Sequence, residues 1–329
     1  DVLICGLGSA GRRHMANAAA LGAKVRGWEH DGKRTAALSA TLGHPVTSDI
    51  DEALQGARAV VIATPTDQHM TLALRAARAG KALFIEKPLS HTLDGIAELS
   101  ALTRDVAVEV GCQLRAHPLL QTLAARLSRA DDGPLLTFHG CVGQRLDQWR
   151  PDTDYRRSYS ASAARGGGAL FDLVHEIDLA NWLCGPIQGV TARQSKVGGL
   201  EMTADDLANL ILESENGAGG SLQLDMVSPV YRRSFEFVCE KAILRWDYVK
   251  GILTRAAPEG ESVIASLPES LSRNDLFLAQ MRHFLERVDA PQCPALCSLD
   301  DGIAALKILL AAKQSAEEGG WQVLETQRA

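Results

Sequence analysis

Lysine, histidine and aspartate side chains occur in this sequence in settings suited to moving a proton on or off a hydroxyl group. Lys87 stands in the tripeptide Glu86-Lys87-Pro88 at the end of an apolar run, and His175 follows Asp172 by three residues, after a triple glycine. Oxidation of a secondary alcohol needs a base for the hydroxyl proton, a donor for the developing alkoxide-like oxygen and a fixed path for the hydride. An ammonium supplies the donor, and an imidazole with an ordinary pKa of about 6.5 exchanges the proton.

We therefore predict that Lys87 and His175 are catalytic, with Asp172 on the same helical face as the histidine to orient it or balance its charge. Other interpretations stay open. Asp178 is a second candidate for orienting the imidazole. Asp172 could instead be a carboxylate stabilised by a helix N-terminus, and Lys87 could be a surface lysine paired with Glu86.

A glycine-rich turn lies at the start of the chain, where Val2–Cys5 reads as a buried strand and a helical stretch begins at Arg12. Between them Gly6, Gly8 and Gly11 form a G-x-G-x-x-G pattern. The order of strand, pattern and helix is typical of dinucleotide binding, because the glycines permit a tight turn, close backbone approach to a pyrophosphate and close packing of the helix on the strand. The helix N-terminus adds unpaired N–H groups and positive potential.

Glu29 ends the next expected strand, near the spacing at which an acid receives a ribose 2′-hydroxyl. A carboxylate there would repel a 2′-phosphate, so we expect NAD to be preferred over NADP. His30, Lys33 and Arg34 lie close enough in sequence to accommodate a phosphate if the loop folds differently.

Strand and helix patterns alternate through the first third of the chain and predict a parallel sheet whose carboxyl edge carries Gly6, Glu29, Thr64 and Lys87. With 329 residues, 46% of them apolar, the chain is long enough for two domains. We place the boundary so that 1–117 is a nucleotide-binding domain and 118–329 a domain for substrate binding and oligomerisation.

The second domain changes to a period of two, which is typical of an antiparallel sheet. We expect one long helix at about 169–185 among its strands, and a hairpin turn at 215–217. The expected strands are 135–142, 190–197, 207–212 and 221–227.

The substrate pocket is expected to combine the domain junction with a loop of the second domain. Gln113, Arg115 and His117 follow the last strand of the first domain. The loop from Trp149 offers aromatic surface beside donors, which suits a sugar, and its arginines would also suit a carboxylate or phosphate. A solvated basic loop is the alternative for any single arginine. The loop residues concerned are Trp149, Arg150, Tyr155, Arg156, Arg157 and Arg165.

Composition excludes several classes of partner. The net charge of −6, with mixed signs and no polybasic stretch, argues against nucleic acid and against an anionic membrane surface. No apolar stretch is long enough to span a bilayer, and we expect a cytoplasmic protein, although the chain lacks an initiator Met and a cleaved leader stays possible. Seven cysteines without framework spacing fit reduced thiols. Cys293 and Cys297 lie four apart without a second ligand pair, so we expect no metal site.

Over essentially its whole length the chain resembles the Gfo/Idh/MocA family, the group of glucose-fructose oxidoreductase and inositol dehydrogenase. The resemblance rests on four segments: Gly6–Gly11 with Arg12 and His14, Ala63-Thr64-Pro65 with His69, Glu86-Lys87-Pro88, and Gly166–Gly168 through Asp172, His175 and Asp178. In that family the aspartate and histidine are more often four residues apart. On a regular helix one residue is a rotation of about 100°, which weakens the assignment of Asp172 more than that of His175.

The resemblance implies an α/β protein with an N-terminal Rossmann domain and a C-terminal α+β domain that has a large, open, mostly antiparallel sheet. It implies NAD(P)-dependent oxidation or reduction of a sugar or cyclitol hydroxyl, homodimers or homotetramers through the open sheet, and often a cis bond before the proline after Lys87. The implied cofactor-binding residues are Gly6, Gly8, Ser9, Ala10, Gly11, Arg12, Glu29, Thr64, Pro65, His69, Glu86, Lys87 and Gln113. The implied substrate residues are Lys87, Arg115, Trp149, Arg150, Tyr155, Asp172 and His175.

Three functional classes follow. The first is an NAD-dependent sugar or cyclitol dehydrogenase. The second is a redox-neutral glycosidase or epimerase with tightly bound NAD, and the third is a non-catalytic nucleotide-binding sensor. A narrower resemblance to branches found with bacterial surface-sugar biosynthesis favours an amino, nucleotide-linked or acidic sugar, with free inositol or an aldose as the competing substrate.

Overall fold

The chain forms two compact units in a computed structural model that describes residues 1–149 and 151–324. Unit 1 comprises Asp1–Ala116 and Ser272–Ile303, and unit 2 comprises His117–Leu271 with the residues from 304 onward. The chain enters unit 2 next to the boundary expected after residue 117. It later returns to unit 1 for 272–303, whereas the sequence analysis assigned that segment to the second domain.

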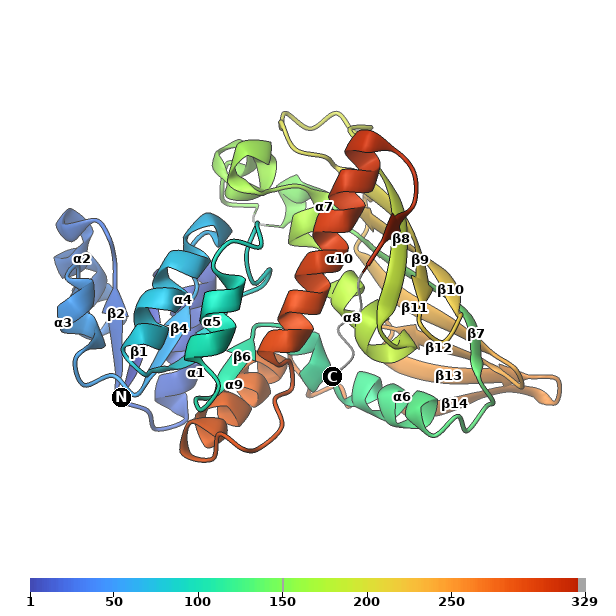
Figure 1. Cartoon of the computed structure of the whole chain (residues 1–329), viewed down its shortest axis with the longest axis horizontal. Coiled ribbons are helices and arrows are strands. Elements are labelled where there is room, and N and C mark those ends of the chain that lie inside the picture. Colours follow the sequence, from blue (N-terminus) through green and yellow to red (C-terminus); the bar gives the residue numbers. More distant parts are fainter. Residues whose placement is uncertain (150, 325–329) are drawn as a thin grey trace. The chain divides into compact units, whose positions relative to one another are not determined.

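Unit 1 contains a six-stranded parallel sheet with the strand order β3-β2-β1-β4-β5-β6 (Figure 1). This is the order of a dinucleotide-binding Rossmann fold, so the expected architecture is confirmed. Strands β1, β4 and β5 are buried along their whole length, which explains their uninterrupted apolar sequences. The strands are β1 Val2–Cys5, β2 Val25–Trp28, β3 Val46–Thr47, β4 Ala59–Ile62, β5 Ala82–Ile85 and β6 Val108–Val110.

The returning segment joins unit 1 because its first helix completes the hydrophobic core there. Helix α9 (Arg273–Asp289) packs on α1, and its Met281 and Phe284 are fully buried with Ile4 and Phe84. The other helices of unit 1 are α1 Ser9–Ala20, α2 Gly32–Leu42, α3 Ile50–Leu54, α4 His69–Arg78 and α5 Ile96–Leu102, and α10 (Leu299–Glu318) continues from unit 1 into unit 2.

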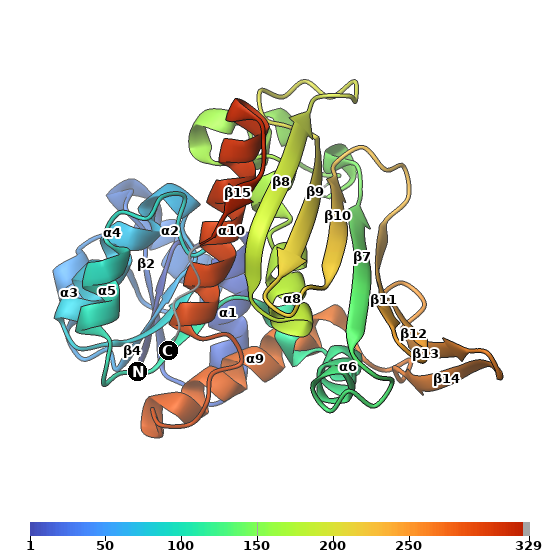
Figure 2. The same ribbon diagram turned by 45° about the vertical axis from the view of Figure 1, so that its right-hand side comes forward.

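Unit 2 contains a nine-stranded sheet in the order β14-β13-β12-β11-β7-β10-β9-β8-β15 (Figure 2). Only β7 and β10 pair in parallel, so the sheet is mostly antiparallel, as expected. The strands are β7 Leu135–Gly143, β8 Ile187–Ser195, β9 Leu207–Ser214, β10 Gly219–Asp225, β11 Arg232–Cys239, β12 Ile243–Asp247, β13 Ile252–Ala257, β14 Gly260–Ser266 and β15 Gln322–Val323.

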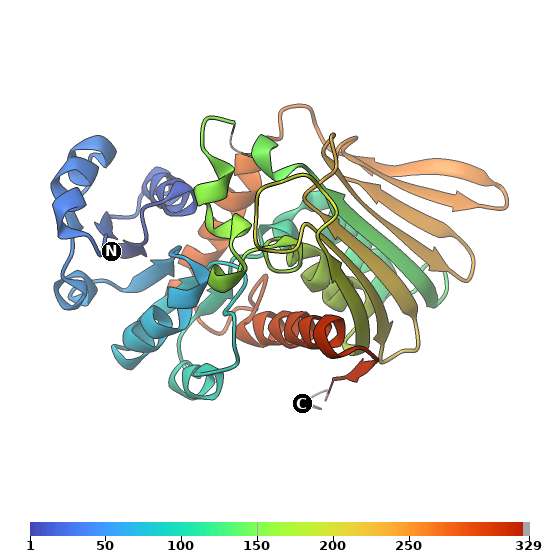
Figure 3. The same cartoon turned by 90° about the horizontal axis from the view of Figure 1, so that it is seen from above.

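Helices α6 (Pro118–Ser128) and α8 (His175–Cys184) cover part of one face of this sheet. Helix α8 packs against β7, β8 and β10, and α6 packs against α8 and β13 (Figure 3). Large apolar side chains, among them Phe235, Phe237 and Trp246, are fully buried in unit 2. Along β9 the buried Leu210 and Leu212 alternate with exposed residues, so this strand presents a second face to the surface.

Two expectations for unit 2 were wrong or incomplete. The single helix expected at 169–185 is two helices, because α7 (Ala169–Asp172) ends at Leu173, whose φ and ψ of −98° and 28° leave the helical region. Strands β11–β14, which cover 232–266, were not assigned from the sequence. Among the described residues no helix combines the length and apolar character needed to cross a bilayer.

Candidate active site

The three glycines of the first turn differ in what surrounds them. Gly6 has φ +87°, and a Cβ on it would lie 2.8 Å from the backbone of Ala63 and Thr64. A Cβ on Gly11 would lie 1.8 Å from the Gly6 carbonyl oxygen, so these two positions are required for packing. Gly8 has no protein atom within 4 Å of its Cβ position, which leaves room for a ligand beside the backbone.

The N-terminus of α1 is open at the same point. Gly8 is the N-cap, no side chain caps the helix, and its first turn, which begins with Ser9 and Ala10, contains no acidic residue. Arg12 is exposed, and its Nε donates to the Leu7 carbonyl at 3.0 Å. An uncapped helix N-terminus beside open space has the geometry and potential that bind a pyrophosphate, so these residues fit a dinucleotide.

Glu29 is buried at the end of β2 and already has basic neighbours. Its carboxylate lies 2.8 Å from Nδ1 of His30 and 3.5 Å from Nη1 of Arg34. The acceptor expected for a ribose hydroxyl therefore stands beside two of the side chains that could accommodate a 2′-phosphate.

Glu86 holds the turn that presents Lys87. Its Oε1 lies 2.6 Å from Nε2 of the buried His14 on α1, and its Oε2 accepts from the Lys87 backbone N–H at 3.1 Å. Burial would raise the pKa of Glu86, but the hydrogen bond and charge of His14, with the charge of Lys87, outweigh it and lower that pKa. The bond between Lys87 and Pro88 is cis.

His69 joins the ends of two neighbouring strands. Its Nδ1 lies 3.0 Å from the Pro88 carbonyl oxygen after β5, and its Nε2 lies 3.0 Å from the Thr64 carbonyl oxygen after β4. Burial lowers the pKa of His69 despite these carbonyls, so the ring is neutral at pH 7 and donates to one of them. Oγ1 of Thr64 is buried without a hydrogen-bond partner among the described residues, and Pro65 caps the 3₁₀ turn Thr66–Gln68.

The residues expected at the junction are held inside the protein. Gln113 and Arg115 are buried in the 3₁₀ turn Gln113–Ala116. Nη1 of Arg115 lies 3.1 Å from Oδ2 of Asp301 and donates to the Leu296 carbonyl at 3.2 Å. His117 is fully buried beside Trp246, where burial and the charge of Arg233 lower its pKa to about 4. Asp172 and His175 are buried to a similar degree, and the roles expected for Gln113 and Arg115 stay predictions.

The aromatic residues of the expected substrate loop are partly exposed and anchored to the backbone. Nε1 of Trp149 donates to the Gln144 carbonyl at 3.1 Å, and the Tyr155 hydroxyl accepts from the Glu201 N–H at 3.0 Å. Arg150 lies outside the described residues.

Asp172 is buried at the end of α7 and accepts a short hydrogen bond from the Tyr159 hydroxyl on its Oδ1. Asp205 lies at the other end of the same helix, where its Oδ2 accepts from the Leu170 N–H at 3.0 Å. The sequence analysis missed Tyr159 and Asp205 as site residues. The only sequence signal for Asp205 is that two aspartates directly precede an apolar strand.

His175 is the first residue of α8 and is buried. Because α7 ends before α8 begins, Asp172 and His175 do not share one regular helix, and the argument from helical spacing does not apply to them. Glu176, the next residue, is fully buried, with its Oε1 2.7 Å from Nε of Arg233 and its Oε2 3.2 Å from Nη2. Burial would lower the pKa of Arg233, but the charge of Glu176 outweighs it and raises that pKa.

Asp178 is buried on α8, one helical turn after His175, so it stays a candidate for orienting the imidazole.

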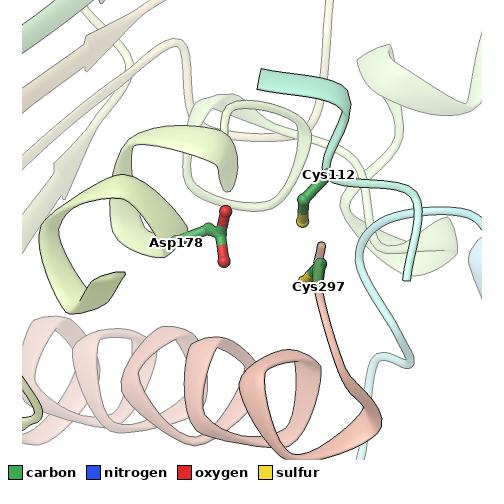
Figure 4. A group of neighbouring side chains, drawn as sticks. All are labelled: Cys112, Asp178 and Cys297. Carbon is green, nitrogen blue, oxygen red and sulfur yellow. The ribbon is translucent and has the colours of Figure 1, made fainter. Parts of the chain in front are cut away.

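Cys297 lies near Cys112 in unit 1, with the two sulfur atoms within 4.8 Å of one another (Figure 4). Asp178, which Figure 4 also labels, belongs to unit 2. Cys293 is exposed.

Two protein-family models match the chain. The model described as "Oxidoreductase family, NAD-binding Rossmann fold" matches residues 1–113, and the "GFO/IDH/MocA C-terminal domain" matches 120–245. Both belong to one family, and together they match well over half of the chain.

Several curated proteins and solved structures are similar to this chain over most of their lengths. The NAD(+)-dependent scyllo-inositol 2-dehydrogenase of Bacillus subtilis is 26% identical over 284 residues, covering 83% of this chain and 80% of that protein. A UDP-N-acetylglucosamine 3-dehydrogenase of Acidithiobacillus ferrooxidans is 25% identical over 320 residues, 94% of each chain. A levoglucosan dehydrogenase solved with NADH shares the fold, with a TM-score of 0.87, 21% identity and 98% of both chains covered.

Alanine substitutions at two glycines should affect different properties, NAD binding at Gly8 and stability at Gly11. Gly8→Ala should leave the melting temperature nearly unchanged but weaken NAD binding about tenfold or more, because the new methyl group fills the open space beside the helix. Gly11→Ala should lower the melting temperature, because its Cβ collides with the Gly6 carbonyl. Thermal unfolding and calorimetric titration with NAD check both, and wild-type affinity in Gly8→Ala would contradict this assignment.

Arg233→Met should lower the free energy of unfolding by about 3–5 kcal/mol, because it leaves Glu176 buried without its counterion. The double variant Glu176→Leu/Arg233→Met should regain most of that loss. Arg145→Met breaks a half-exposed pair with Asp147 and serves as a control, with little change in stability expected. Urea unfolding gives the free energy of unfolding of all three variants. Equal losses in Arg233→Met and Arg145→Met would show that the buried pair has no special role.

Proposed function

The chain belongs to the Gfo/Idh/MocA family of oxidoreductases, and we propose that it transfers a hydride between a sugar or cyclitol hydroxyl and NAD. The observation that carries this proposal is the arrangement in unit 1. An open helix N-terminus stands beside Gly8, and the turn that holds Lys87 is fixed to the same helix through Glu86 and His14. The relatives named as dehydrogenases of scyllo-inositol and of UDP-N-acetylglucosamine support the substrate class.

In the proposed reaction NAD supplies the hydride acceptor. Lys87 donates a hydrogen bond to the substrate oxygen and stabilises the charge that develops on it. His175 accepts the hydroxyl proton during oxidation and returns it during reduction. Asp172 orients His175 or balances its charge, with Asp178 as the alternative. The open backbone at Gly8 and the free N–H groups of α1 bind the pyrophosphate, and the buried hydroxyl of Thr64 is an additional hydrogen-bonding group at the same strand edge.

We infer a preference for NAD over NADP from Glu29, because a carboxylate repels a 2′-phosphate. The opposing influence comes from two basic residues, His30 and Arg34, that already contact this carboxylate. The name of the Bacillus subtilis relative specifies NAD(+), which supports the same direction.

The substrate is either a free cyclitol or aldose, or a larger sugar that carries an anionic group. Arg145 and Arg156 are engaged with Asp147 and Asp154, and these contacts reduce their availability for a substrate anion. Arg165 is exposed in the same loop region, and it is the residue we expect to favour a nucleotide-linked or acidic sugar.

We also propose a homodimer or homotetramer formed through the outward face of the nine-stranded sheet, in the cytoplasm. Ile211 is 57% exposed in the middle of β9, and an apolar residue on a sheet face suits a subunit contact. No disulfide joins the described cysteines, and most of them are buried, which suits a reducing compartment.

The proposed activity predicts formation of NADH with at least one substrate class. The panel is scyllo- and myo-inositol, aldoses, uronic acids and UDP-N-acetylglucosamine, each with NAD and with NADP, followed by absorbance of the reduced nicotinamide. Lys87→Ala and His175→Ala should each lower kcat/KM by about 10²–10⁴-fold, since each removes a group that acts on the reacting hydroxyl. Lys250→Ala is an exposed control and should match the wild type. Tight NAD binding without turnover on any substrate would contradict the dehydrogenase and favour a redox-neutral enzyme or a sensor.

Light scattering tests the assembly. The wild type should have the mass of two or four chains, and Ile211→Glu should shift it toward the monomer, because a charge on the contacting face must be desolvated. A monomeric wild type would contradict the proposed interface.

A further inference from the structure

The carboxyl group of Asp172 is held by a phenol. Asp172 is 4% exposed, and its Oδ1 accepts a short hydrogen bond from the Tyr159 hydroxyl. Tyr159 lies in the 3₁₀ turn Tyr159–Ala161 and is itself partly exposed. A donor on a carboxylate oxygen favours the ionised form and fixes its orientation, so this hydroxyl affects both the direction and the charge of Asp172.

A second carboxyl group stands at the start of the same helix. Oδ2 of Asp205 accepts from the Leu170 N–H at 3.0 Å, and its backbone oxygen accepts from the Ala169 N–H at 3.0 Å. Gly168 has φ +114°, and a Cβ there would lie 2.1 Å from Oδ1 of Asp205. Only glycine at position 168 therefore allows Asp205 to approach this closely. The last residue of the triple glycine thus permits the contact between Asp205 and the start of α7.

The two carboxyl groups influence one another through their charges. Burial raises the pKa of Asp205 to about 6, the Leu170 N–H opposes that change, and the charge of Asp172 adds to it. Electrostatic coupling is reciprocal, so the Asp205 carboxylate makes Asp172 harder to ionise, whereas the Tyr159 hydroxyl makes it easier.

Other charged groups on the packed elements are already neutralised or engaged. Helix α7 packs on β9 and β10. Asp206, before β9, accepts the N–H groups of Val197 and Gly198 at 2.8 Å each, and Asp225, at the end of β10, lies 2.7 Å from Arg232. On the following helix α8, His175 is the proposed base, and Glu176 is paired with Arg233.

We propose that Tyr159 and Asp205 are positioning residues of the reaction, which act through Asp172 and oppose one another in setting its charge. The proposal rests on the function proposed above. It assigns to the Tyr159 hydroxyl the role of keeping Asp172 ionised and oriented, and to Asp205 the role of a nearby negative charge that opposes this ionisation.

The two roles predict opposite shifts of the pH–rate profile. Tyr159→Phe removes a donor from Asp172, which raises the pKa of Asp172. On the role proposed above, in which Asp172 balances the charge of His175, it raises the pKa of His175 as well. Asp205→Asn removes a negative charge, which lowers both pKa values. The acid limb of kcat/KM should therefore move to higher pH in Tyr159→Phe and to lower pH in Asp205→Asn, each by about 0.5–1 unit. A purely structural role would lower activity without moving the limb in opposite directions.

The experiment measures kcat/KM from pH 5 to pH 9 for the wild type and both variants. Asp131→Asn, at an exposed carboxylate of unit 2 that is paired with Arg129, is the control and should leave the limb where it is. Opposite shifts support the proposal. Unshifted limbs, or shifts in the same direction, overturn it.

An NMR titration of ¹³C-labelled aspartate carboxyl groups separates this proposal from the proposed activity, because it needs no substrate. Asp205 should titrate near pH 6 in the wild type, and its midpoint should fall by a few tenths of a unit in Asp172→Asn. A midpoint near the ordinary value of about 3.9, or one that Asp172→Asn does not change, overturns the coupling. If the wild type lacks turnover and the titration gives the expected values, the proposed function fails while the coupling stands.

Discussion

The pair of contacts made by the largely buried carboxylate of Glu86 is the interaction on which the arrangement of unit 1 depends. One oxygen bonds His14, on the helix whose N-terminus follows the glycine turn, and the other accepts the N–H of Lys87. A single side chain thus fixes the proposed anion site and the proposed catalytic lysine with respect to each other. Ionised Glu86 is tolerated in this buried place because a histidine and a lysine supply compensating charge.

Unit 2 repeats this arrangement with different residues. In both units a largely or fully buried glutamate stands next in sequence to the proposed catalytic residue, Glu86 before Lys87 and Glu176 after His175. Each glutamate is tied to a distant element by a short contact, to α1 through His14 and to β11 through Arg233. A charge buried with its partner is costly to separate, so such pairs hold a functional side chain in one place more firmly than apolar packing alone.

The sequence predicted the parts of the site that depend on local pattern and not those that depend on packing between distant segments. The glycine turn, Glu29 and the Lys87 turn follow from spacing within strand–turn–helix units, and the structure places them at the ends of β1, β2 and β5 as the pattern requires. Arg115 was predicted as a substrate residue, but no sequence signal indicated its contact with Asp301, nearly two hundred residues later. Tyr159 had no recognisable signal and Asp205 only the pair of aspartates before β9, because only the fold brings these two residues to opposite ends of α7. The break at Leu173 also had none, and it removed the helical geometry on which the pairing of Asp172 with His175 had been argued.

The most direct test of the proposed reaction follows the hydrogen itself. Scyllo-inositol and UDP-N-acetylglucosamine, each deuterated at the ring carbons that carry hydroxyl groups, would be incubated with the protein and NAD, and the reduced nicotinamide analysed by mass spectrometry and NMR. Direct hydride transfer predicts deuterium at C4 of NADH, on one face of the ring, together with a ketone on the sugar or cyclitol. Substrate that is consumed while its product keeps the label, with no labelled NADH released, would contradict a dehydrogenase and indicate redox-neutral chemistry.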